Sequence, residues 1–301
     1  MPPQPLYPSA PPIGRLALGS STFGREIQAE AAFALMDRAL ERGVTLFDTA
    51  ATYTAGASET IMGQWLASRQ PARDSVIVAT KIYPPYTPAD IDAATALSAK
   101  RLGRDVIDVL YLHKWDPAVE TAETLRALDG LVRSGRVRAL GASNFNARQL
   151  GNALSTQTTL GLECFRLLQN NNNLAVRDVD DALVELARQY AVAIVTYSPI
   201  AAGFLTGKHR QGVVPGSRFD MAPGHQPIYF APEPERRLAQ LEALSSLSGQ
   251  TMAKLALAWA LNRPGVSAVL IGGRGPDYVD QAFAALEVTD PGLLKALAAI
   301  A

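Results

Sequence analysis

Short apolar runs alternate with longer amphipathic segments along this chain. Most of the runs are apolar on both alternating faces, which is typical of a parallel sheet with helices outside and a packed centre inside. The runs predicted as strands are RLALG (15–19), TLFDT (45–49), VIVATK (76–81), VIDVLYLH (106–113), VRALGAS (137–143), CFRLLQ (164–169), AIVTYS (193–198) and VSAVLIG (266–272).

The amphipathic segments between these runs have the period of helices. The predicted helices cover residues 28–42, 58–68, 88–102, 120–134, 178–190 and 250–262. Gly43 and Gly135 follow two of them, where a left-handed residue commonly ends a helix. The alternation predicts an α/β fold, a closed (β/α)8 TIM barrel rather than a doubly wound sheet. No shift in composition marks a boundary, so residues 1–301 are expected to form one domain.

One connection interrupts the alternation. From Gly203 to about Pro234, glycine, proline and charged residues replace any clear period. So long a connection in a barrel is usually functional, for example a lid over a site, and the alternative is a disordered surface insertion. An extra helix is predicted over residues 234–248, before the seventh barrel helix at 250–262. Only a short C-terminal tail follows the last barrel helix, so we expect the mouth to be open on that side.

Composition and charge narrow the class of protein. Lys+Arg and Asp+Glu both number 28, and this balance argues against nucleic acid or an anionic membrane as the main partner. Nowhere do about 18 apolar residues follow one another without interruption, so no transmembrane helix is predicted. The proline-rich start MPPQPLYPSAPPIG is expected to be an extended lead-in and not a signal peptide. A cytoplasmic location is therefore expected, and the single cysteine, Cys164, is interpreted as a small core residue.

Polar residues close or follow three consecutive predicted strands. Asp48 and Tyr53 lie in LFDTAATYTAGASE (46–59), Lys81 closes VIVATK and His113 closes VIDVLYLH. The carboxyl ends of barrel strands converge on one mouth, so these side chains are expected to meet. A buried Lys81 needs a carboxylate, which Asp48 can supply. The cation would lower the pKa of Tyr53 from about 10, and so help the phenol to donate a proton.

Each of the four residues also has a structural interpretation. Asp48 could cap a loop, and Tyr53 could be a surface aromatic residue. Lys81 could extend to solvent, and His113 could be a satisfied strand-end histidine. Their occurrence in three consecutive βα units favours a single proton-donating site, in which His113 orients a substrate oxygen.

With these motifs in this order, the chain resembles the aldo-keto reductase superfamily of NAD(P)(H)-dependent carbonyl reductases. The resemblance runs from LALGSSTFG to VLIGGRGPDYVDQ, nearly the whole chain. It implies that Tyr53 is the general acid, that Lys81 and Asp48 tune it, and that His113 orients the carbonyl group.

The resemblance also implies a nicotinamide cofactor, although no G-x-G-x-x-G segment follows a predicted strand. Ser143, Asn144 and Gln169 match residues that bind the carboxamide, and Tyr197 matches the aromatic residue that stacks on the ring. These positions could alternatively form a strand-end turn, a buried amide and a core aromatic. SPIAAGFLTGK (198–208) resembles the loop over the pyrophosphate. The cofactor contacts that the resemblance implies in this loop and near the C-terminus are Ser198, Ile200, Gly203, Lys208, Gly272, Arg274 and Gln281.

The residues that match the adenosine end of the cofactor site include a possible phosphate-binding segment, and two positions of the site depart from the family pattern. IGGRGPDYVDQA opens a helix whose N-terminus could hold phosphate. Arg274 matches the residue that binds the adenosine 2′-phosphate, which favours NADPH, with NADH as the alternative. Ala282 stands where many relatives carry an asparagine that faces the adenine. The asparagine run at 170–173 stands where many relatives carry an aromatic residue around position 172.

The substrate is expected to be a small carbonyl compound, an aldehyde, ketone or sugar. Aromatic residues near the strand ends could enclose it or merely pack the rim, and these are Phe23, Tyr83, Tyr86 and Trp115. A second interpretation is a cofactor-binding regulatory subunit, similar to the potassium-channel β-subunits of this family. A third is a metal-dependent barrel enzyme, which would need more ligands than Asp48, His113 and Asp116. We therefore expect no metal, and the oligomeric state stays open.

Overall fold

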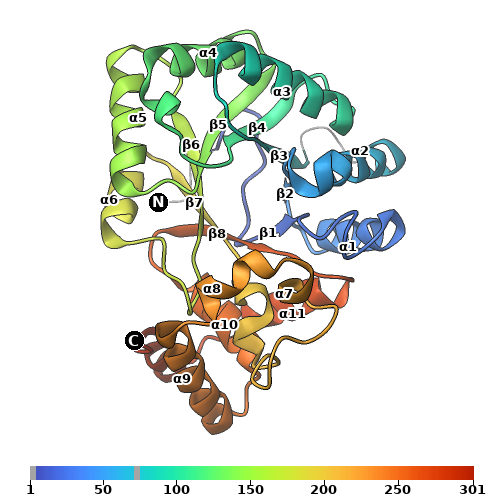
Figure 1. The fold of residues 1–301 in the computed structure, drawn as a ribbon, viewed down its shortest axis with the longest axis vertical. Coiled ribbons are helices and arrows are strands. Elements are labelled where there is room, and N and C mark those ends of the chain that lie inside the picture. Colours follow the sequence, from blue (N-terminus) through green and yellow to red (C-terminus); the bar gives the residue numbers. More distant parts are fainter. Residues whose placement is uncertain (1–4, 71–74) are drawn as a thin grey trace.

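Eight parallel strands close into a barrel in the computed structural model, which describes residues 5–70 and 75–301 (Figure 1). Each strand pairs with its neighbour in the chain, and β1 pairs with β8 to complete the ring. The predicted (β/α)8 barrel is therefore confirmed. The strands are β1 Leu16–Gly19, β2 Leu46–Asp48, β3 Ile77–Ile82, β4 Ile107–Leu112, β5 Val137–Ser143, β6 Phe165–Asn171, β7 Ala193–Tyr197 and β8 Val266–Ile271.

Helices surround the strands (Figure 1). The helices between β1 and β7 are α1 Ala29–Glu41, α2 Ala57–Arg69, α3 Pro88–Leu102, α4 Ala122–Arg133, α5 Ala147–Thr159 and α6 Asp181–Gln189. The sequence pattern delineates no helix after the fifth strand, yet α5 is there. Its start carries a capping box, in which the Asn146 side chain accepts from Gln149 N and the Gln149 side chain accepts from Asn146 N. That signal predicts a helix start even where the apolar period is weak.

The long connection between β7 and β8 is built from short helical segments. They are η3 Ala201–Thr206, α7 Arg218–Met221, η4 Pro223–His225 and α8 Gln226–Tyr229, followed by α9 Pro232–Ser248 and α10 Met252–Leu261. Phe204, Phe219 and Tyr229 are buried here, and the rings of Phe219 and Phe230 lie 5.1 Å apart. The connection is thus a packed element, and its interpretation as a disordered insertion is wrong. Helix α9 is the extra helix that the sequence predicts.

After β8 come α11 (Asp277–Ala285) and α12 (Pro291–Ala298). The sequence predicts only a short tail here, but α12 is a second C-terminal helix, and it packs against α9 and α10. Among the described residues, no helix has both the length and the apolar character to cross a membrane.

The hydrophobic core has two layers, because the side chains of each strand alternate. One layer lies between strands and helices. The other fills the barrel and includes Leu46, Ile77, Val109 and Leu167. The alternation places the last inward side chains of several strands at the carboxyl end of the barrel, beyond the apolar layers. These side chains are Asp48, Lys81, Ser143 and Gln169.

The N-terminal segment packs at the other end of the barrel. Leu6 and Tyr7 belong to the inner apolar cluster, and Arg138, near the start of β5, lies 4.9 Å from the Tyr7 ring centre. Thr45, just before β2, donates to the carbonyl oxygen of Pro12. These contacts are all at the amino ends of strands, so the segment covers that end. Residues 1–4 of the predicted lead-in lie outside the described residues.

Candidate active site

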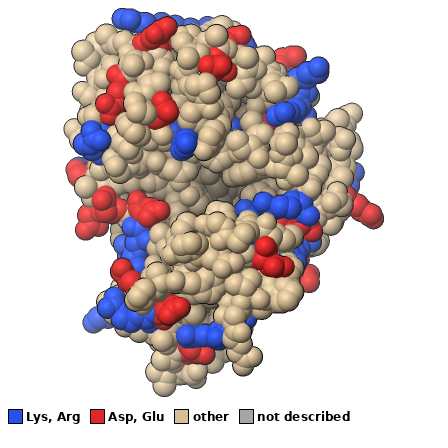
Figure 2. Space-filling model, viewed as in Figure 1, with Lys and Arg blue, Asp and Glu red and all other residues tan. Residues whose placement is uncertain are grey.

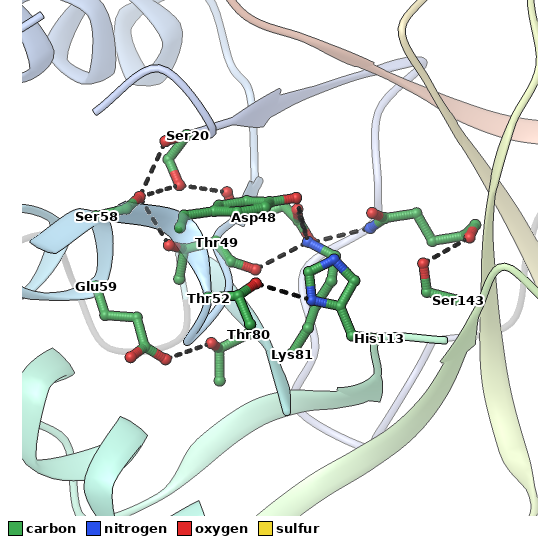
Figure 3. Close-up of polar contacts among 12 residues, drawn as sticks. Ser20, Asp48, Thr49, Thr52, Ser58, Glu59, Thr80, Lys81, His113 and Ser143 are labelled. Carbon is green, nitrogen blue, oxygen red and sulfur yellow. Dashed lines mark hydrogen bonds and ion pairs between the residues drawn. The ribbon is translucent and has the colours of Figure 1, made fainter. Parts of the chain in front are cut away.

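A buried ion pair lies at the centre of the mouth. The Lys81 ammonium forms a hydrogen-bonded ion pair with Asp48, and both side chains are almost fully buried (Figure 3). Lys81 Nζ also donates to the carbonyl oxygen of Thr49 at 2.8 Å and to Tyr53 Oη at 3.3 Å. Gln169 donates to the other Asp48 oxygen at 2.9 Å. These hydrogen bonds offset the cost of removing both charges from water, which a buried ion pair alone would not do.

An unusual turn holds Tyr53 over this pair. Tyr53 begins the short helix η1 (Tyr53–Gly56), and the next two residues, Thr54 and Ala55, have φ of 48° and 52°. A left-handed conformation costs a residue with a Cβ roughly 1–2 kcal/mol. Thr54 Oγ1 offsets part of this cost by donating to the carbonyl oxygen of Phe23. The chain thus reverses sharply after Tyr53, as strained segments often do at functional sites.

Burial controls the protonation of Tyr53. It raises the pKa of the phenol above its usual value, and this effect exceeds the lowering caused by Lys81, while Asp48 raises the pKa further. Lys81 therefore has the expected lowering effect, but burial outweighs it and the net pKa of Tyr53 is raised and not lowered. Because Asp48 neutralises Lys81, the phenol experiences little net positive charge. Tyr53 is accordingly protonated at neutral pH and holds a proton that it can donate.

His113 lies on the other side of Tyr53. Their ring centres are 5.8 Å apart in an edge-to-face arrangement, and Tyr83 packs edge-to-face on the same imidazole at 5.9 Å. Burial, assisted by the charge of Lys81, lowers the pKa of His113 to about 3. The imidazole is therefore neutral near pH 7 and carries one N–H, which can donate to a substrate oxygen.

Two buried networks fix the elements that carry these residues (Figure 3). The hydroxyl groups of Ser20 and Ser58 lie 2.8 Å apart, and that of Thr49 lies 2.9 Å from Ser58, which joins the ends of β1 and β2 to α2. The fully buried Glu59 accepts from Thr80 Oγ1 at 2.6 Å and from Arg101 Nη1 at 3.1 Å. These networks connect β3 and α3 to the start of α2, directly after the Tyr53 turn.

The predicted carboxamide contacts lie beside Asp48 and His113. Asn144 adopts φ of 60° at the end of β5, and its Nδ2 donates to the His113 carbonyl oxygen at 2.8 Å. Tyr197 Oη donates to Asn144 Oδ1 at 2.7 Å, and Ser143 Oγ donates to the carbonyl oxygen of Gln169. The four residues therefore form one hydrogen-bonded wall. The Gln169 amide nitrogen also donates to Asp48, which joins this wall to the buried ion pair.

A second cluster follows β7. Ser198, Ala201, Ala202 and Gly203 all have positive φ, so the loop is tightly coiled. Gly203 has φ of 95°, which favours glycine, and a Cβ there would lie 2.8 Å from Cε of Lys208, whose side chain folds over this loop. Burial and the nearby charge of Arg274 lower the pKa of Lys208. Two cations from separate connections thus approach each other, and such a pair suits a phosphate group.

The outer residues differ from one another in exposure. Ile200 is half-buried, whereas Gly272, Arg274 and Gln281 are exposed. The Arg274 guanidinium donates to the carbonyl oxygen of Gly216. Ala282 is buried within α11, so its methyl group is part of the core.

The asparagine run is part of the framework. Asn170 Oδ1 accepts from Phe145 N, and its Nδ2 donates to the Phe145 carbonyl oxygen, which ties the β5 turn to β6. Asn173 Oδ1 accepts from the amides of Ala175 and Val176 and closes a turn. Asn171 Nδ2 lies 3.4 Å from Tyr229 Oη in α8. Most of these asparagines therefore have a structural role: they form hydrogen bonds with backbone groups and link β6 to the long connection.

The predicted pocket aromatics divide into two groups. Phe23 and Tyr86 are buried in the core, and Tyr86 Oη donates to the carbonyl oxygen of Lys114 at 3.0 Å. Their assignment to an accessible pocket wall is therefore wrong, because both rings are already covered by protein. Tyr83 is 47% exposed and Trp115 is half-buried, so these two can still meet a substrate.

Figure 2 shows a hollow near the centre of the face turned to the viewer in Figure 1, with α7 and α8 below it. Charges of both signs are scattered over this face, while the hollow is bordered mostly by uncharged side chains. Within residues 5–70 and 75–301, no three His, Cys, Asp or Glu side chains lie close enough together to hold a metal ion.

Two neighbours of His113 and Lys81, Thr52 and Tyr111, are not among the site residues predicted from the sequence. Thr52 Oγ1 lies 3.2 Å from His113 Nδ1, and no sequence signal predicts this contact. Tyr111 fills the barrel beneath Lys81, whose ammonium lies 5.9 Å from its ring centre. The strand alternation does predict an inward Tyr111, because it stands two residues before His113.

Comparisons with known proteins agree with this geometry. A sequence model described as the aldo/keto reductase family matches residues 15–291. The "uncharacterized oxidoreductase YrpG" of Bacillus subtilis is 30% identical over 95% of this chain and 91% of its own length. A "probable voltage-gated potassium channel subunit beta" of Oryza sativa is 31% identical over 92% of this chain and 88% of its own length. "Norsolorinic acid reductase B" of Dothistroma septosporum is 29% identical over 92% of this chain and 75% of its own length.

Proposed function

Because this chain belongs to the aldo/keto reductase family, we propose that it reduces an aldehyde, ketone or sugar carbonyl to the alcohol with NAD(P)H. The observation that carries the proposal is the contact of the buried Lys81 ammonium with both Asp48 and the Tyr53 hydroxyl. A protonated phenol, held by a compensated cation and flanked by a neutral imidazole, is equipped to donate one proton to a carbonyl oxygen.

Each residue has a separate part in this reaction. The bound nicotinamide would supply the hydride that adds to the carbonyl carbon. Tyr53 gives its hydroxyl proton to the carbonyl oxygen, and Lys81 stabilises the phenolate that remains until solvent reprotonates it. Asp48 keeps Lys81 charged and in place. His113 donates its single N–H to the carbonyl oxygen and directs that oxygen toward Tyr53.

The residues of the mouth fit a nicotinamide dinucleotide. Ser143, Asn144 and Gln169 present amide and hydroxyl groups beside the catalytic group, and Tyr197 presents an aromatic ring. The glycine-dependent loop at Gly203 and the cations after it suit the phosphates. These contacts would hold the cofactor, while Tyr83 and Trp115 would meet the substrate.

The first test is cofactor binding followed by turnover. Purified protein should change the fluorescence of NADPH or NADH on mixing, and it should then oxidise the bound nucleotide with members of a panel of aldehydes, ketones and sugars. Tyr53→Phe should lose about 10²-fold or more in kcat, since a positioned general acid is removed. Tyr190→Phe, at the half-buried residue that directly follows α6 and precedes β7, is the matched control and should keep full activity. Unchanged nucleotide fluorescence, or full activity in Tyr53→Phe, would refute the proposal.

We also propose that NADPH is preferred to NADH, because Arg274 and Lys208 place two cations together. Arg274→Ala should weaken NADPH binding by about tenfold or more, the value of a charge-assisted hydrogen bond, and leave NADH binding nearly unchanged. Fluorescence titrations of both nucleotides measure this, with the exposed Arg236→Ala as the control. Equal losses for the two nucleotides would contradict the preference.

The relatives named as potassium-channel β-subunits favour a second candidate, a cofactor-binding regulatory subunit. This function needs the nucleotide site but not rapid turnover. Protein that binds NADPH tightly, yet shows no single-turnover oxidation with any carbonyl compound of the panel, would support this candidate over the reductase.

A further inference from the structure

The Thr52 hydroxyl does not cap the short helix that follows it, and its backbone has helical rather than extended φ and ψ. Thr52 is the residue before the short helix η1, a position where threonine commonly caps the helix, but its hydroxyl makes no cap hydrogen bond. Instead Oγ1 lies 3.2 Å from His113 Nδ1 (Figure 3). In the described part of the chain, this imidazole is the hydroxyl's one hydrogen-bond partner.

The backbone on both sides of this contact is fixed. Ala51 N donates to the Lys81 carbonyl oxygen at 3.0 Å, and Tyr53 N donates to the Ala50 carbonyl oxygen at 3.1 Å. His113 N donates to the carbonyl oxygen of Ile82. The Thr52–His113 contact is exposed, but it joins two segments whose backbones are held by hydrogen bonds: the turn between β2 and η1, and the residue after β4.

The contact bears on which ring nitrogen of His113 carries the proton. A neutral imidazole has one N–H, and its position is set by the partner of the other nitrogen. If the Thr52 hydroxyl donates to Nδ1, the proton stays on Nε2, which can then donate to a carbonyl oxygen. In the opposite tautomer, Nε2 would present a lone pair to the lone pairs of that oxygen, and the two would repel.

We propose that Thr52 is a positioning residue, whose hydroxyl donates to His113 Nδ1 and so keeps the N–H on Nε2, where it faces the substrate carbonyl. This inference rests on the proposed reductase function, for which His113 must be a donor. Thr52 directly precedes Tyr53. One short segment would therefore position the general acid, Tyr53, and also set the tautomer of His113, the second group that contacts the carbonyl oxygen.

The decisive measurement is the tautomer of His113 in Thr52→Val, which keeps the shape of the side chain and removes the hydroxyl. The chain has three histidines, so ¹⁵N-histidine labelling gives few signals, and His113→Gln identifies those of His113. Between pH 6.5 and 8, the wild type should show ¹⁵N shifts of an Nε2–H tautomer. Thr52→Val should show a mixture or the Nδ1–H form, and Thr52→Ser should restore the wild-type signals.

Kinetics provide the second readout. Thr52→Val should lower kcat/KM for carbonyl reduction by about 5- to 10-fold, the value of one hydrogen bond, while NADPH affinity stays the same and Thr52→Ser recovers the rate. Thr45→Val, which loses one hydroxyl contact at the opposite end of the barrel, is the matched control and should leave both tautomer and rate unchanged.

An Nδ1–H tautomer in the wild type, or an unchanged tautomer in Thr52→Val, would overturn the inference. The tautomer is read without substrate, so this result is separate from the fate of the proposed function. If the protein reduced no carbonyl compound, the reductase proposal would fail, and the ¹⁵N shifts would still report whether Thr52 sets the tautomer.

Discussion

At the scale of single residues, burial decides the protonation states in the mouth of this barrel. Burial alone would lower the pKa of Lys81, but Asp48 and Tyr53 outweigh it and raise the pKa above its usual value. The same burial keeps Tyr53 protonated and His113 neutral. A proton donor and an uncharged hydrogen-bond donor can therefore coexist beside a buried cation, because each lies in surroundings that disfavour its charged form.

The depressed pKa of His113 predicts a pH dependence of stability. The unfolded histidine takes up a proton as pH falls below about 6.5, whereas the folded one resists protonation down to about 3. The wild type should therefore lose stability progressively as pH falls through this window. Between pH 7 and pH 5, the free energy of unfolding of His113→Gln should fall by about 1–2 kcal/mol less than that of the wild type. Urea unfolding at both pH values measures this, and identical losses in the two proteins would contradict it.

At the scale of elements, the positions of the strands depend on a few close approaches. Tyr111 on β4 is paired with Gly141 on β5, and a Cβ at Gly141 would lie 2.4 Å from the Tyr111 ring. The missing side chain makes room for the phenol ring inside the barrel, directly below Lys81. The floor of the candidate active site is thus formed by a large residue and a glycine on adjacent strands.

Gly141→Ala should destabilise the protein by about 2–3 kcal/mol, the cost of overpacking a core. The double variant with Tyr111→Leu should recover much of this loss, because the ring that collides with the new Cβ is gone. Gly130→Ala, on helix α4 with nothing near its new Cβ, is the control and should be neutral or stabilising. Urea midpoints compare the variants. A Gly141→Ala protein as stable as the wild type would mean that the strands readily move apart.

At the scale of the whole molecule, the long β7–β8 connection reaches across to the β1 side of the mouth. Arg218 in α7 donates to Glu26 at 2.7 Å, and Glu26 is almost fully buried and also paired with Arg25. Arg274, after β8, donates to the connection at Gly216. These contacts anchor the packed helical segments beside the hollow (Figure 2). That the connection acts as a lid stays a prediction.

Arg218→Gln should loosen this connection. Limited proteolysis should cleave it between β7 and α9 several-fold faster than in the wild type, since the buried Glu26 loses one of two cations. NADPH, where bound, should dissociate faster in stopped-flow measurements. Arg188→Gln removes a fully exposed helix pair with Glu185 and is the matched control, with little effect expected. Equal cleavage rates in all three proteins would show that the contact does not restrain the connection.

The sequence by itself determined the barrel and its eight strands, and it predicted that Asp48, Tyr53, Lys81 and His113 gather at one end of the barrel. Strand alternation and strand-end position are local properties, and the carboxyl ends of parallel strands must meet wherever the barrel closes. Helix α5 was the exception, because its short apolar stripe was a weaker signal than its capping box. The identity of the cofactor and the roles of Ser143, Asn144 and Tyr197 came from resemblance and remain predictions.

Only the tertiary structure decided how these residues are protonated and which of them are accessible. The net effect of Lys81 on Tyr53 depends on burial and on Asp48, which no spacing along the chain reveals. Phe23 and Tyr86 stand near strand ends in the sequence but are covered by other elements in space. The Thr52–His113 contact spans 61 residues and two connections, so it exists only once the barrel is closed. Chain position predicts where polar groups gather, whereas their charge, exposure and partners depend on everything packed around them.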